Sequence, residues 1–388
     1  MKEFSGLDFY DVDGLLTEEE KLIRKTVRDF VTKEVLPIIE EYNEKALFPK
    51  QLIPKMAELG FLGAQLKGYG CADLGSNAYG LIMQELERGD SGLRSFVSVQ
   101  GALVMYPILT FGSDEQKEKW LPLLQQGKAI GCFGLTEPDF GSFPSGMRTA
   151  AKKSGDHYIL NGAKMWITNG SVADICVIWA KTSEGIRGFL VEKGTPGLKA
   201  SDIKGKFSLR ASVTSELVLE DCKIPAKNLL PKTEGLKSAL LCLNQARYGI
   251  SWGAIGAALA CYHEALEYSK DRIQFEKPIA SFQLVQQKLA WMVQEITKAQ
   301  LLAWRLGKLK DEGKVKHYQI SLAKKNNVWM ALEIARMARD MLGANGTAFE
   351  YPVGRHMCNL EAVKTYEGTH DIHTLVIGEA VTGIAAYR

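Results

Sequence analysis

A carboxylate flanked by an aromatic residue and a glycine lies near the end of the chain, in Tyr366-Glu367-Gly368-Thr369, with Asp371 close behind. The glycine removes a side chain beside the acid, so the backbone or a carbonyl group of a ligand can approach closely. Transfer of such a carboxyl group out of water raises its pKa, as a base working near neutral pH requires. Glu367 is therefore a candidate base. The same triplet is, however, more often a helix end or a turn than a catalytic site.

A second pair of residues that could do chemistry is Glu87 and Arg94, which flank a glycine-containing turn. A cation in the first turn of a helix opposes the helix dipole at a cost of roughly 0.3–1 kcal/mol. One interpretation is a surface ion pair worth about 0–1 kcal/mol. The other is a buried guanidinium that binds a ligand carboxylate through two hydrogen bonds.

The first third of the chain has the apolar spacing that is typical of helices. Thr17 and Glu20 form a capping box ahead of apolar residues at helical spacing, and Pro37 is expected to close that helix. Asp90 or Ser91 can cap a helix that Pro107 is expected to end. The further expected helices cover residues 52–62, 78–88 and 93–105.

The middle of the chain, from residue 129 to about 231, has the pattern of short strands. Asn161-Gly162 is a strong hairpin signal, so a hairpin is expected between strands 157–160 and 164–167. Short strands without intervening helices predict an antiparallel sandwich or barrel rather than a parallel dinucleotide-binding fold. The other expected strands are 175–179, 188–191 and 216–219.

The last third is expected to form long helices over 236–272, 282–310 and 315–342, with a short link at 311–313. Long helices joined by short links make a bundle. The predicted fold class is therefore mainly α with a β middle domain. The expected divisions are an N-terminal helical domain (1–128), a β domain (129–235) and a C-terminal four-helix bundle (236–388).

Composition limits the functional classes. The 388 residues are 46% hydrophobic and 24% charged, and the net charge of +3 gives no support for nucleic-acid binding. The sequence contains no run of about eighteen apolar residues, so no membrane span is expected. The seven cysteines show no metal-binding spacing, so no metal is expected, and reduced thiols in a cytoplasmic protein are the expected state.

Four ordered segments of the chain resemble the flavin-dependent acyl-CoA dehydrogenases, and the resemblance covers essentially the whole length. Within that family, 87–95, 206–212 and 244–250 are most similar to glutaryl-CoA dehydrogenases. The family resemblance lies in 131–138, in Trp166-Ile167-Thr168-Asn169, in Arg272-Ile273-Gln274-Phe275 with Gln283, and in 366–369.

The resemblance implies the fold above, a bound FAD and a base at Glu367. Removing hydrogen from a saturated Cα–Cβ bond needs a hydride acceptor, which side chains cannot supply. No Rossmann fingerprint follows a predicted strand, which argues against a nicotinamide cofactor. The implied FAD-binding residues are Phe133, Leu135, Thr136, Ser142, Trp166, Thr168, Arg272, Phe275, Gln283, Asp340, Gly343, Ala344, Thr369 and Asp371.

The resemblance also implies an acyl-CoA thioester as substrate, an electron-transfer flavoprotein as partner, and a homotetramer in which 340–344 act on a neighbouring subunit's cofactor. Arg247 is expected to make a buried ion pair, a ligand contact, or both. The implied substrate-binding residues are Glu87, Arg94, Ser95, Ser142, Leu243, Asn244, Arg247, Tyr366 and Gly368.

The expected reaction is oxidation of glutaryl-CoA with loss of CO2 to give crotonyl-CoA. Arg94 would hold the distal carboxylate, and Tyr366 favours the decarboxylating branch. The alternatives are a dehydrogenase or oxidase for another short acyl-CoA, a non-decarboxylating glutaryl-CoA dehydrogenase, and a non-catalytic flavin-binding protein. Four residues depart from the family pattern with effects left open, namely Phe140, Phe143, Glu276 and Ala344.

Overall fold

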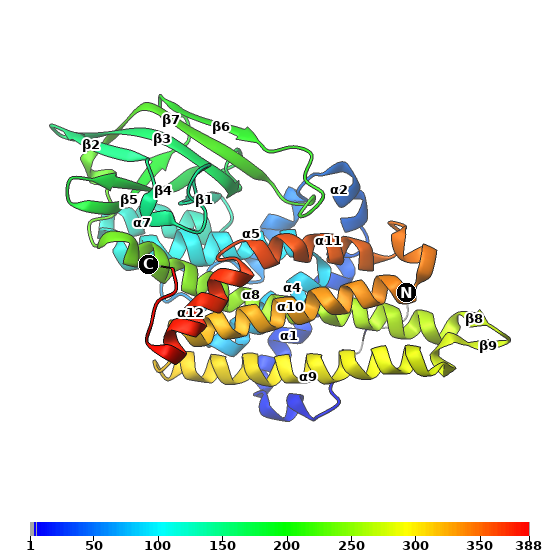
Figure 1. The fold of residues 1–388 in the computed structure, drawn as a ribbon. Helices are drawn as coiled ribbons and strands as arrows, with labels where there is room; N and C mark the ends of the chain where they lie inside the picture. The colour runs from blue at the N-terminus through cyan, green and yellow to red at the C-terminus, as the bar shows by residue number, and fades with distance from the viewer. Residues whose placement is uncertain (1–3, 5, 388) are drawn as a thin grey trace.

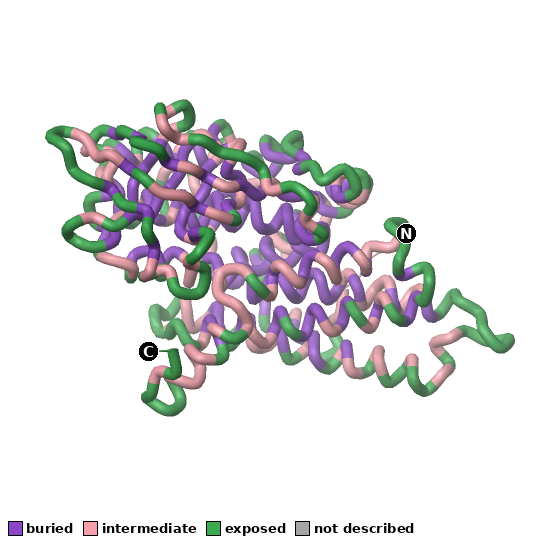
Figure 2. The backbone as a smooth tube through the Cα atoms, turned by 45° about the horizontal axis from the view of Figure 1, so that its top comes forward, coloured by how far each residue is buried: buried purple, intermediate pink, exposed green. Residues whose placement is uncertain are grey.

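The computed structural model describes residue 4 and residues 6–387. A β region lies on one side of the molecule and a helical bundle on the other, with the first helices wedged between and behind them (Figure 1). Buried backbone concentrates in the interior, whereas the hairpin at the far end of the bundle is exposed (Figure 2). The order of helical, β and helical regions is the one that the sequence predicts.

The N-terminal region is helical, and the predicted capping box at the first helix is present, with Thr17 and Glu20 bonded reciprocally. Asp90 caps α5 by accepting a hydrogen bond from the Gly92 amide. The α-helices are α1 (Glu18–Phe30), α2 (Ile39–Lys45), α3 (Ile53–Glu58), α4 (Ser76–Gly89), α5 (Ser91–Ser98), α6 (Tyr106–Phe111) and α7 (Asp114–Gln125).

The prediction that Pro107 ends its helix is wrong. A π-helical segment, Val99–Met105, follows α5 and leads directly into α6. Pro107 lies in the first turn of α6, where a missing N–H costs little. The continuous stretch Ser91–Phe111 is long and apolar enough to cross a membrane, but 89% of its most apolar window is buried inside the fold. Burial of this kind is typical of a core helix.

The β region is one curled sheet with strand order β1-β4-β2-β3-β7-β6, and β5 pairs with β4. Most pairs are antiparallel, as predicted, but β1 and β2 run parallel to β4. The strands are β1 (Gly131–Gly134), β2 (Ala150–Ser154), β3 (His157–Thr168), β4 (Ile175–Thr182), β5 (Gly185–Glu192), β6 (Leu198–Asp202) and β7 (Thr214–Pro225).

The predicted hairpin at Asn161-Gly162 is wrong, because β3 runs straight through both residues. The register between β3 and β7 shifts at this point, and Asn161 Oδ1 accepts a hydrogen bond of 2.8 Å from the Asp221 amide. A Cβ atom at Gly162 would lie 2.6 Å from Thr149 Cα, so the glycine serves a close backbone approach. The Asn-Gly pair, which is typical of turns, therefore marks a β-bulge here and not a chain reversal.

The C-terminal region is a helical bundle whose three long helices lie within two residues of their predicted limits. A small hairpin projects between α8 and α9 at one end of the bundle (Figure 1). The elements are α8 (Gly235–Asp271), β8 (Ile273–Gln274), β9 (Lys277–Pro278), α9 (Gln283–Asp311), α10 (His317–Met341), α11 (Pro352–Thr365) and α12 (His370–Thr382).

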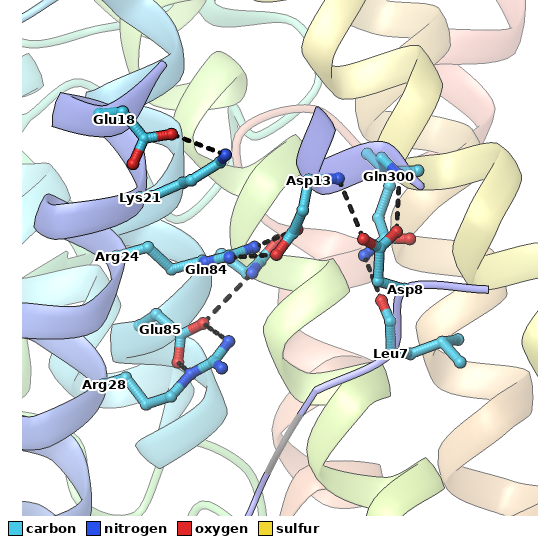
Figure 3. Close-up of polar contacts among 11 residues, drawn as sticks. Leu7, Asp8, Asp13, Glu18, Lys21, Arg24, Arg28, Gln84, Glu85 and Gln300 are labelled. Atoms are coloured by element: carbon cyan, nitrogen blue, oxygen red, sulfur yellow. Dashed lines mark hydrogen bonds and ion pairs between the residues drawn. The ribbon is translucent and has the colours of Figure 1, made fainter. Parts of the chain in front are cut away.

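The N-terminal segment is fastened to the bundle by polar contacts (Figure 3). Arg28 on α1 donates to both oxygens of Glu85 on α4, at 2.8 and 3.2 Å. Gln300 on α9 donates to the Leu7 carbonyl at 3.1 Å. Every residue of α4 is buried, so this helix forms the centre of the helical core. The Arg28 contact links α1 to α4, the helix that carries Glu87.

Candidate functional site

A large cavity of about 2220 Å³ lies between the β region and the helices. Sites for a single drug-sized ligand usually measure about 300–1,000 Å³, so this one has room for a cofactor together with a substrate. The predicted site residues that line it are Ser95, Phe133, Leu135, Thr136, Ser142, Trp166, Thr168, Leu243, Asn244, Arg247, Tyr366, Glu367, Gly368 and Thr369.

A second group of predicted residues lies elsewhere, near the end of the bundle that carries the β8–β9 hairpin. Arg272, Gly343 and Ala344 line a separate cavity of about 270 Å³. Phe275 is 86% exposed in the adjoining hairpin, and Gln283 begins α9 beside it. Two more predicted residues line neither of these cavities: Asp340, which makes an ion pair with Lys288, and Asp371, which lies exposed in the first turn of α12.

The candidate base lies in a tight connection between two helices. Helix α11 ends at Thr365, and Thr369 caps α12 by accepting a hydrogen bond from the Ile372 amide. Glu367 has a left-handed backbone with φ of 53°. Such a conformation is uncommon for a residue other than glycine and costs on the order of 1–3 kcal/mol. The surrounding contacts must therefore hold it.

Gly368 follows the base with φ of 92°. A Cβ atom at this position would lie 2.9 Å from His373 Nε2 and 3.3 Å from Arg247 Nη2. The missing side chain thus admits two groups of the protein itself, next to the acid. The sequence predicted that a ligand would approach closely at this glycine. That approach stays a prediction, and the structure shows two protein groups beside the glycine.

Burial raises the pKa of Glu367, while the charges of Arg94, Arg247 and Lys324 act in the opposite direction. Its Oε2 atom is buried and has no hydrogen-bond partner within the described chain. A desolvated carboxylate with a free oxygen at a cavity wall can accept a proton from a bound molecule. This is the property that the sequence predicted for Glu367.

Arg247 supports the backbone of this acid. Its Nε atom donates to the Glu367 carbonyl at 2.7 Å, and Nη1 donates to Asn244 Oδ1 at 3.3 Å. Burial lowers the pKa of Arg247, and the carboxylate of Glu367 raises it. Arg247 also lines the cavity. The sequence anticipated an ion pair or a ligand contact but not this carbonyl contact.

Arg94 is completely buried on α5. Its Nε atom donates to Glu87 Oε2 at 2.7 Å, and Nη2 donates to the Tyr366 hydroxyl. Ser95 Oγ lies 3.3 Å from the same hydroxyl. Nη1 of Arg94 is buried without a hydrogen-bond partner in the described chain, as is Glu87 Oε1. The pair is therefore buried, not a surface ion pair.

Gly253 on α8 makes room for this pair. A Cβ atom on Gly253 would lie 2.0 Å from Glu87 Oε2 and 3.1 Å from Arg94 Nε. Neither Glu87 nor Arg94 lines the cavity, whereas Ser95 and Tyr366 in front of them do. The guanidinium is thus held by Glu87 of α4 and by Tyr366 of the connection between α11 and α12, behind the wall that contains the candidate base.

The opposite wall comes from the β region and has the character that a flavin ring needs. Trp166 has φ of 63° at an irregularity between β3 and β7, and its side chain is 58% exposed at the cavity. Thr136 and Thr168 lie on the same wall and carry hydroxyl groups for a ring edge. An exposed indole with apolar neighbours can pack against a flat aromatic ring. These residues fit FAD.

Sequence reasoning missed a buried ion pair behind this wall. Lys164 Nζ donates to Glu137 Oε1 at 2.8 Å and to the Leu135 carbonyl at 3.1 Å. Glu137 also accepts hydrogen bonds from the amides of Arg148 and Thr149. Burial lowers the pKa of Lys164 to about 8, against the opposite effect of Glu137. The pair fixes the loop that contains Thr136.

A second missed residue is Lys324 on α10, which is 1% exposed. Its ammonium donates to the carbonyls of Tyr366 and Gly368, on either side of the base. A signal was present in the sequence. Lys324 lies at helical spacing from Ile320 and Val328, so it belongs to an apolar stripe.

Comparison with known proteins agrees with this geometry. Family models for the N-terminal, middle and C-terminal domains of acyl-CoA dehydrogenases match residues 17–128, 132–222 and 233–382. A short-chain-specific acyl-CoA dehydrogenase of Megasphaera elsdenii is 37% identical over 95% of this chain and 100% of its own.

Solved structures give the same result. A glutaryl-CoA dehydrogenase from Mycobacterium smegmatis has a TM-score of 0.96 at 56% identity, covering 97% of each chain. Another from the same organism, in complex with FADH2, has a TM-score of 0.98 at 52% identity, covering 100% of each chain. With its cavity, its flavin-compatible wall and these matches along its length, the chain belongs to the acyl-CoA dehydrogenase family of FAD-dependent oxidoreductases.

Proposed function

We propose that this enzyme oxidises glutaryl-CoA and decarboxylates the product to crotonyl-CoA and CO2. The observation that carries the proposal is the completely buried Arg94, whose Nη1 has no hydrogen-bond partner in the described chain. It lies behind the cavity wall that holds Glu367, bonded to Tyr366. A buried guanidinium nitrogen favours a carboxylate ligand. The similarity to two glutaryl-CoA dehydrogenases also supports it.

In the proposed oxidation, the carboxylate of Glu367 takes a proton from Cα of the acyl group. FAD, when bound, supplies the acceptor for the hydride that leaves Cβ. Arg247 keeps the backbone of Glu367 in place during this step through the Glu367 carbonyl. Thr136, Trp166 and Thr168, which line the cavity, would hold the flavin, while Ser142, Leu243 and Asn244 would contact the thioester.

In the proposed second step, glutaconyl-CoA loses its distal carboxylate as CO2. The electrons of the broken C–C bond pass into the conjugated thioester, and protonated Glu367 returns a proton to the γ carbon. Two unit charges about 4 Å apart interact by ~4 kcal/mol at an effective dielectric constant of 20. Glu87 shares the charge of Arg94. This sharing weakens the hold on the substrate carboxylate, so that CO2 can leave.

The test is anaerobic mixing with a panel of acyl-CoA thioesters, followed by product analysis under turnover. Glutaryl-CoA should bleach the flavin absorbance fastest and give crotonyl-CoA and CO2. A site that buries Arg94 should reject butyryl-CoA, which leaves Nη1 of the guanidinium without a partner. Accumulation of glutaconyl-CoA would rule out the decarboxylation. Equal rates with butyryl-CoA would rule out the substrate assignment.

A second candidate function is dehydrogenation of a short saturated acyl-CoA. It is favoured by the short-chain-specific relative of Megasphaera elsdenii at 37% identity. In that case Arg94, Glu87 and Tyr366 form a structural network only. Fast flavin reduction by butyryl-CoA, with none by glutaryl-CoA, would establish this alternative.

We also propose a homotetramer in which a neighbouring subunit completes each cofactor site. Arg272, Gly343 and Ala344 line a cavity apart from the one that holds Glu367. The exposed Phe275 adjoins them. Because this second cavity is separate, we propose that its residues bind the cofactor of a neighbouring copy of the chain. A monomer by light scattering that retains FAD and activity would contradict this assembly.

The reduced flavin needs an onward acceptor, and we propose an electron-transfer flavoprotein. The resemblance of the whole chain to dehydrogenases supports this acceptor over oxygen. Steady-state turnover should be fast with an electron-transfer flavoprotein and slow in air alone. Rapid turnover on oxygen would identify an oxidase. The cytoplasmic location expected from the sequence stays a prediction.

A further inference from the structure

The buried amine of Lys324 binds the loop that carries Glu367. Lys324 Nζ donates to the Gly368 carbonyl at 2.9 Å and to the Tyr366 carbonyl at 3.0 Å, with a longer contact of 3.5 Å to the Lys364 carbonyl. The Lys364 carbonyl belongs to the last turn of α11, where helix carbonyls lack intrahelical partners and the helix dipole is negative. All three acceptors therefore favour a cation.

The number of acceptors indicates the charge of this amine. An ammonium has three N–H donors, and a neutral amine has two. Burial lowers the pKa of Lys324 to about 7, and the charges of Arg247 and Arg94 add to that effect. The carboxylate of Glu367 raises it. The positive charge of Lys324 and the negative charge of Glu367 therefore stabilise one another.

We propose that Lys324 is a positioning residue for proton abstraction: it holds Glu367 in its left-handed conformation, and its charge favours the ionised carboxylate. The inference rests on the proposed role of Glu367 as the base. The geometry supports it directly, because the two carbonyls that Lys324 binds most closely belong to the residues before and after Glu367. A rotation of either peptide would break one of these bonds and redirect the acid.

Other charged or titratable groups face the same carboxylate. Arg247 shares part of this role, because it donates to the carbonyl of Glu367 itself and its charge also favours the ionised carboxylate. Lys324 differs in binding the carbonyls on either side of the acid. His373 stays neutral, because burial and the nearby cations lower its pKa to about 3. The remaining groups around Glu367 and Lys324 come from four elements: Tyr79 of α4, Arg94 of α5, Arg247 of α8, and His370 of α12, together with Tyr366 of the loop itself.

Two substitutions separate the hydrogen bonds of Lys324 from its charge. Lys324→Met keeps the apolar stem of the side chain and removes both. Lys324→Gln removes the charge and keeps two of the three N–H donors, on a side chain one atom shorter. The matched control is Lys325→Met, which removes the next ammonium on α10; in the described structure Lys325 donates to none of the three carbonyls.

The measurement is the rate of anaerobic flavin reduction from pH 6 to 9 in the FAD-loaded enzyme, with glutaryl-CoA, or with butyryl-CoA if that is the active substrate. Lys324→Met should lose roughly 10²-fold, since small displacements of reacting groups cost about that much. The apparent pKa of the base should rise in both Lys324 variants, so the loss is greatest at pH 6. Lys325→Met should follow the parent.

A pH profile unchanged in shape, with only a uniform loss of rate, would overturn the proposal and leave Lys324 a purely structural residue. If Lys324→Met does not retain FAD, the profile of Lys324→Gln decides. Glu367→Gln is measured in parallel. If that variant still reduces the flavin, the role of Glu367 fails. If it is inactive while both Lys324 variants match the parent's profile, only the present inference fails.

Discussion

Two buried arginines near the turn between α4 and α5 have opposite bonding patterns. Arg355 on α11 donates to Glu40 Oε1 at 2.5 Å, to Asp90 Oδ2 at 2.7 Å and to the Gly89 carbonyl at 2.8 Å. None of its nitrogens is buried without a partner. Arg94 has one carboxylate partner, Glu87, and its Nη1 is unpaired in the described chain.

The difference in hydrogen bonding between the two arginines distinguishes a network that stabilises the fold from one that can bind a ligand. Buried polar groups are almost always hydrogen-bonded, and an unpaired buried nitrogen costs about 1–3 kcal/mol or more. At the guanidinium of Arg355 that cost is avoided with protein groups in the described chain, although Oε2 of its partner Glu40 is buried without a hydrogen-bond partner there. At Arg94 it is not, and there the neighbouring Tyr366 precedes Glu367 in the cavity wall. Burial alone therefore does not identify a binding arginine.

The largest expected effect is that of replacing Glu367. Of the two arginine networks, only that of Arg94 adjoins this acid. Glu367→Gln keeps the size of the side chain and removes its proton affinity. Base catalysis is typically worth about 10²–10⁴-fold, so flavin reduction should fall by at least that factor. FAD content and acyl-CoA binding should be unchanged by absorbance and titration. Near-normal reduction would assign the base to another residue.

Parallel substitutions of the two arginines test the comparison directly. Removing one partner of a buried charge pair costs about 3–5 kcal/mol. In Arg355→Gln this should appear as lost stability in denaturant, because Asp90 keeps a buried charge and Glu40 a partly buried one, while kcat per folded enzyme stays near the parent value.

In Arg94→Gln the loss should appear in catalysis. Truncating a buried charged contact to a ligand costs about 2–5 kcal/mol, or roughly 30- to 5,000-fold in kcat/KM for glutaryl-CoA. The rate with butyryl-CoA should fall less. The comparison breaks if Arg94→Gln only destabilises the fold, or if Arg355→Gln changes the preference between the two thioesters.

Much of this fold was predictable from local patterns. The capping box at Thr17, the cap at Asp90 and the limits of the long helices follow from short-range chemistry that the sequence displays. The errors arose where distant contacts decide. Gly162 looks like a turn residue, yet it is needed because Thr149 lies against it. The helix through Pro107 continues because a π-helical segment precedes it.

The site divides in the same way. Residues within motifs, such as Glu367 and Trp166, were predicted and line one cavity. Lys324 and Lys164 were missed because no motif announces a lysine that folds inward to bind carbonyls. Their roles depend on groups 44 and 29 residues away in the chain. The division of the chain at 128/129 and 235/236 stays a prediction.

A smaller effect is expected at the glycine that accommodates the Arg94 pair. Gly253→Ala would place a methyl group 2.0 Å from Glu87 Oε2, so the carboxylate would have to move. Overpacking a buried site costs about 1–3 kcal/mol. Both stability and the preference for glutaryl-CoA should fall. Gly378→Ala, on α12 with open space around it, is the control and should leave both near the parent.

The smallest expected effect is that of Glu367 on the free energy of unfolding. Because burial raises the pKa of Glu367, the folded state binds its proton more tightly than the unfolded chain does. Its contribution to stability is thus fully present below the pKa of the unfolded state and is lost as pH rises through the folded value.

Glutamine resembles the protonated acid at every pH. Glu367→Gln should therefore match the parent in thermal unfolding at low pH and exceed it slightly once pH passes the raised pKa. Arg355→Gln, by contrast, should be less stable than the parent at neutral pH. If Glu367→Gln were less stable than the parent at neutral pH, the three cations around Glu367 would outweigh its burial. The acid would then belong, like Arg355, to a network that serves the fold.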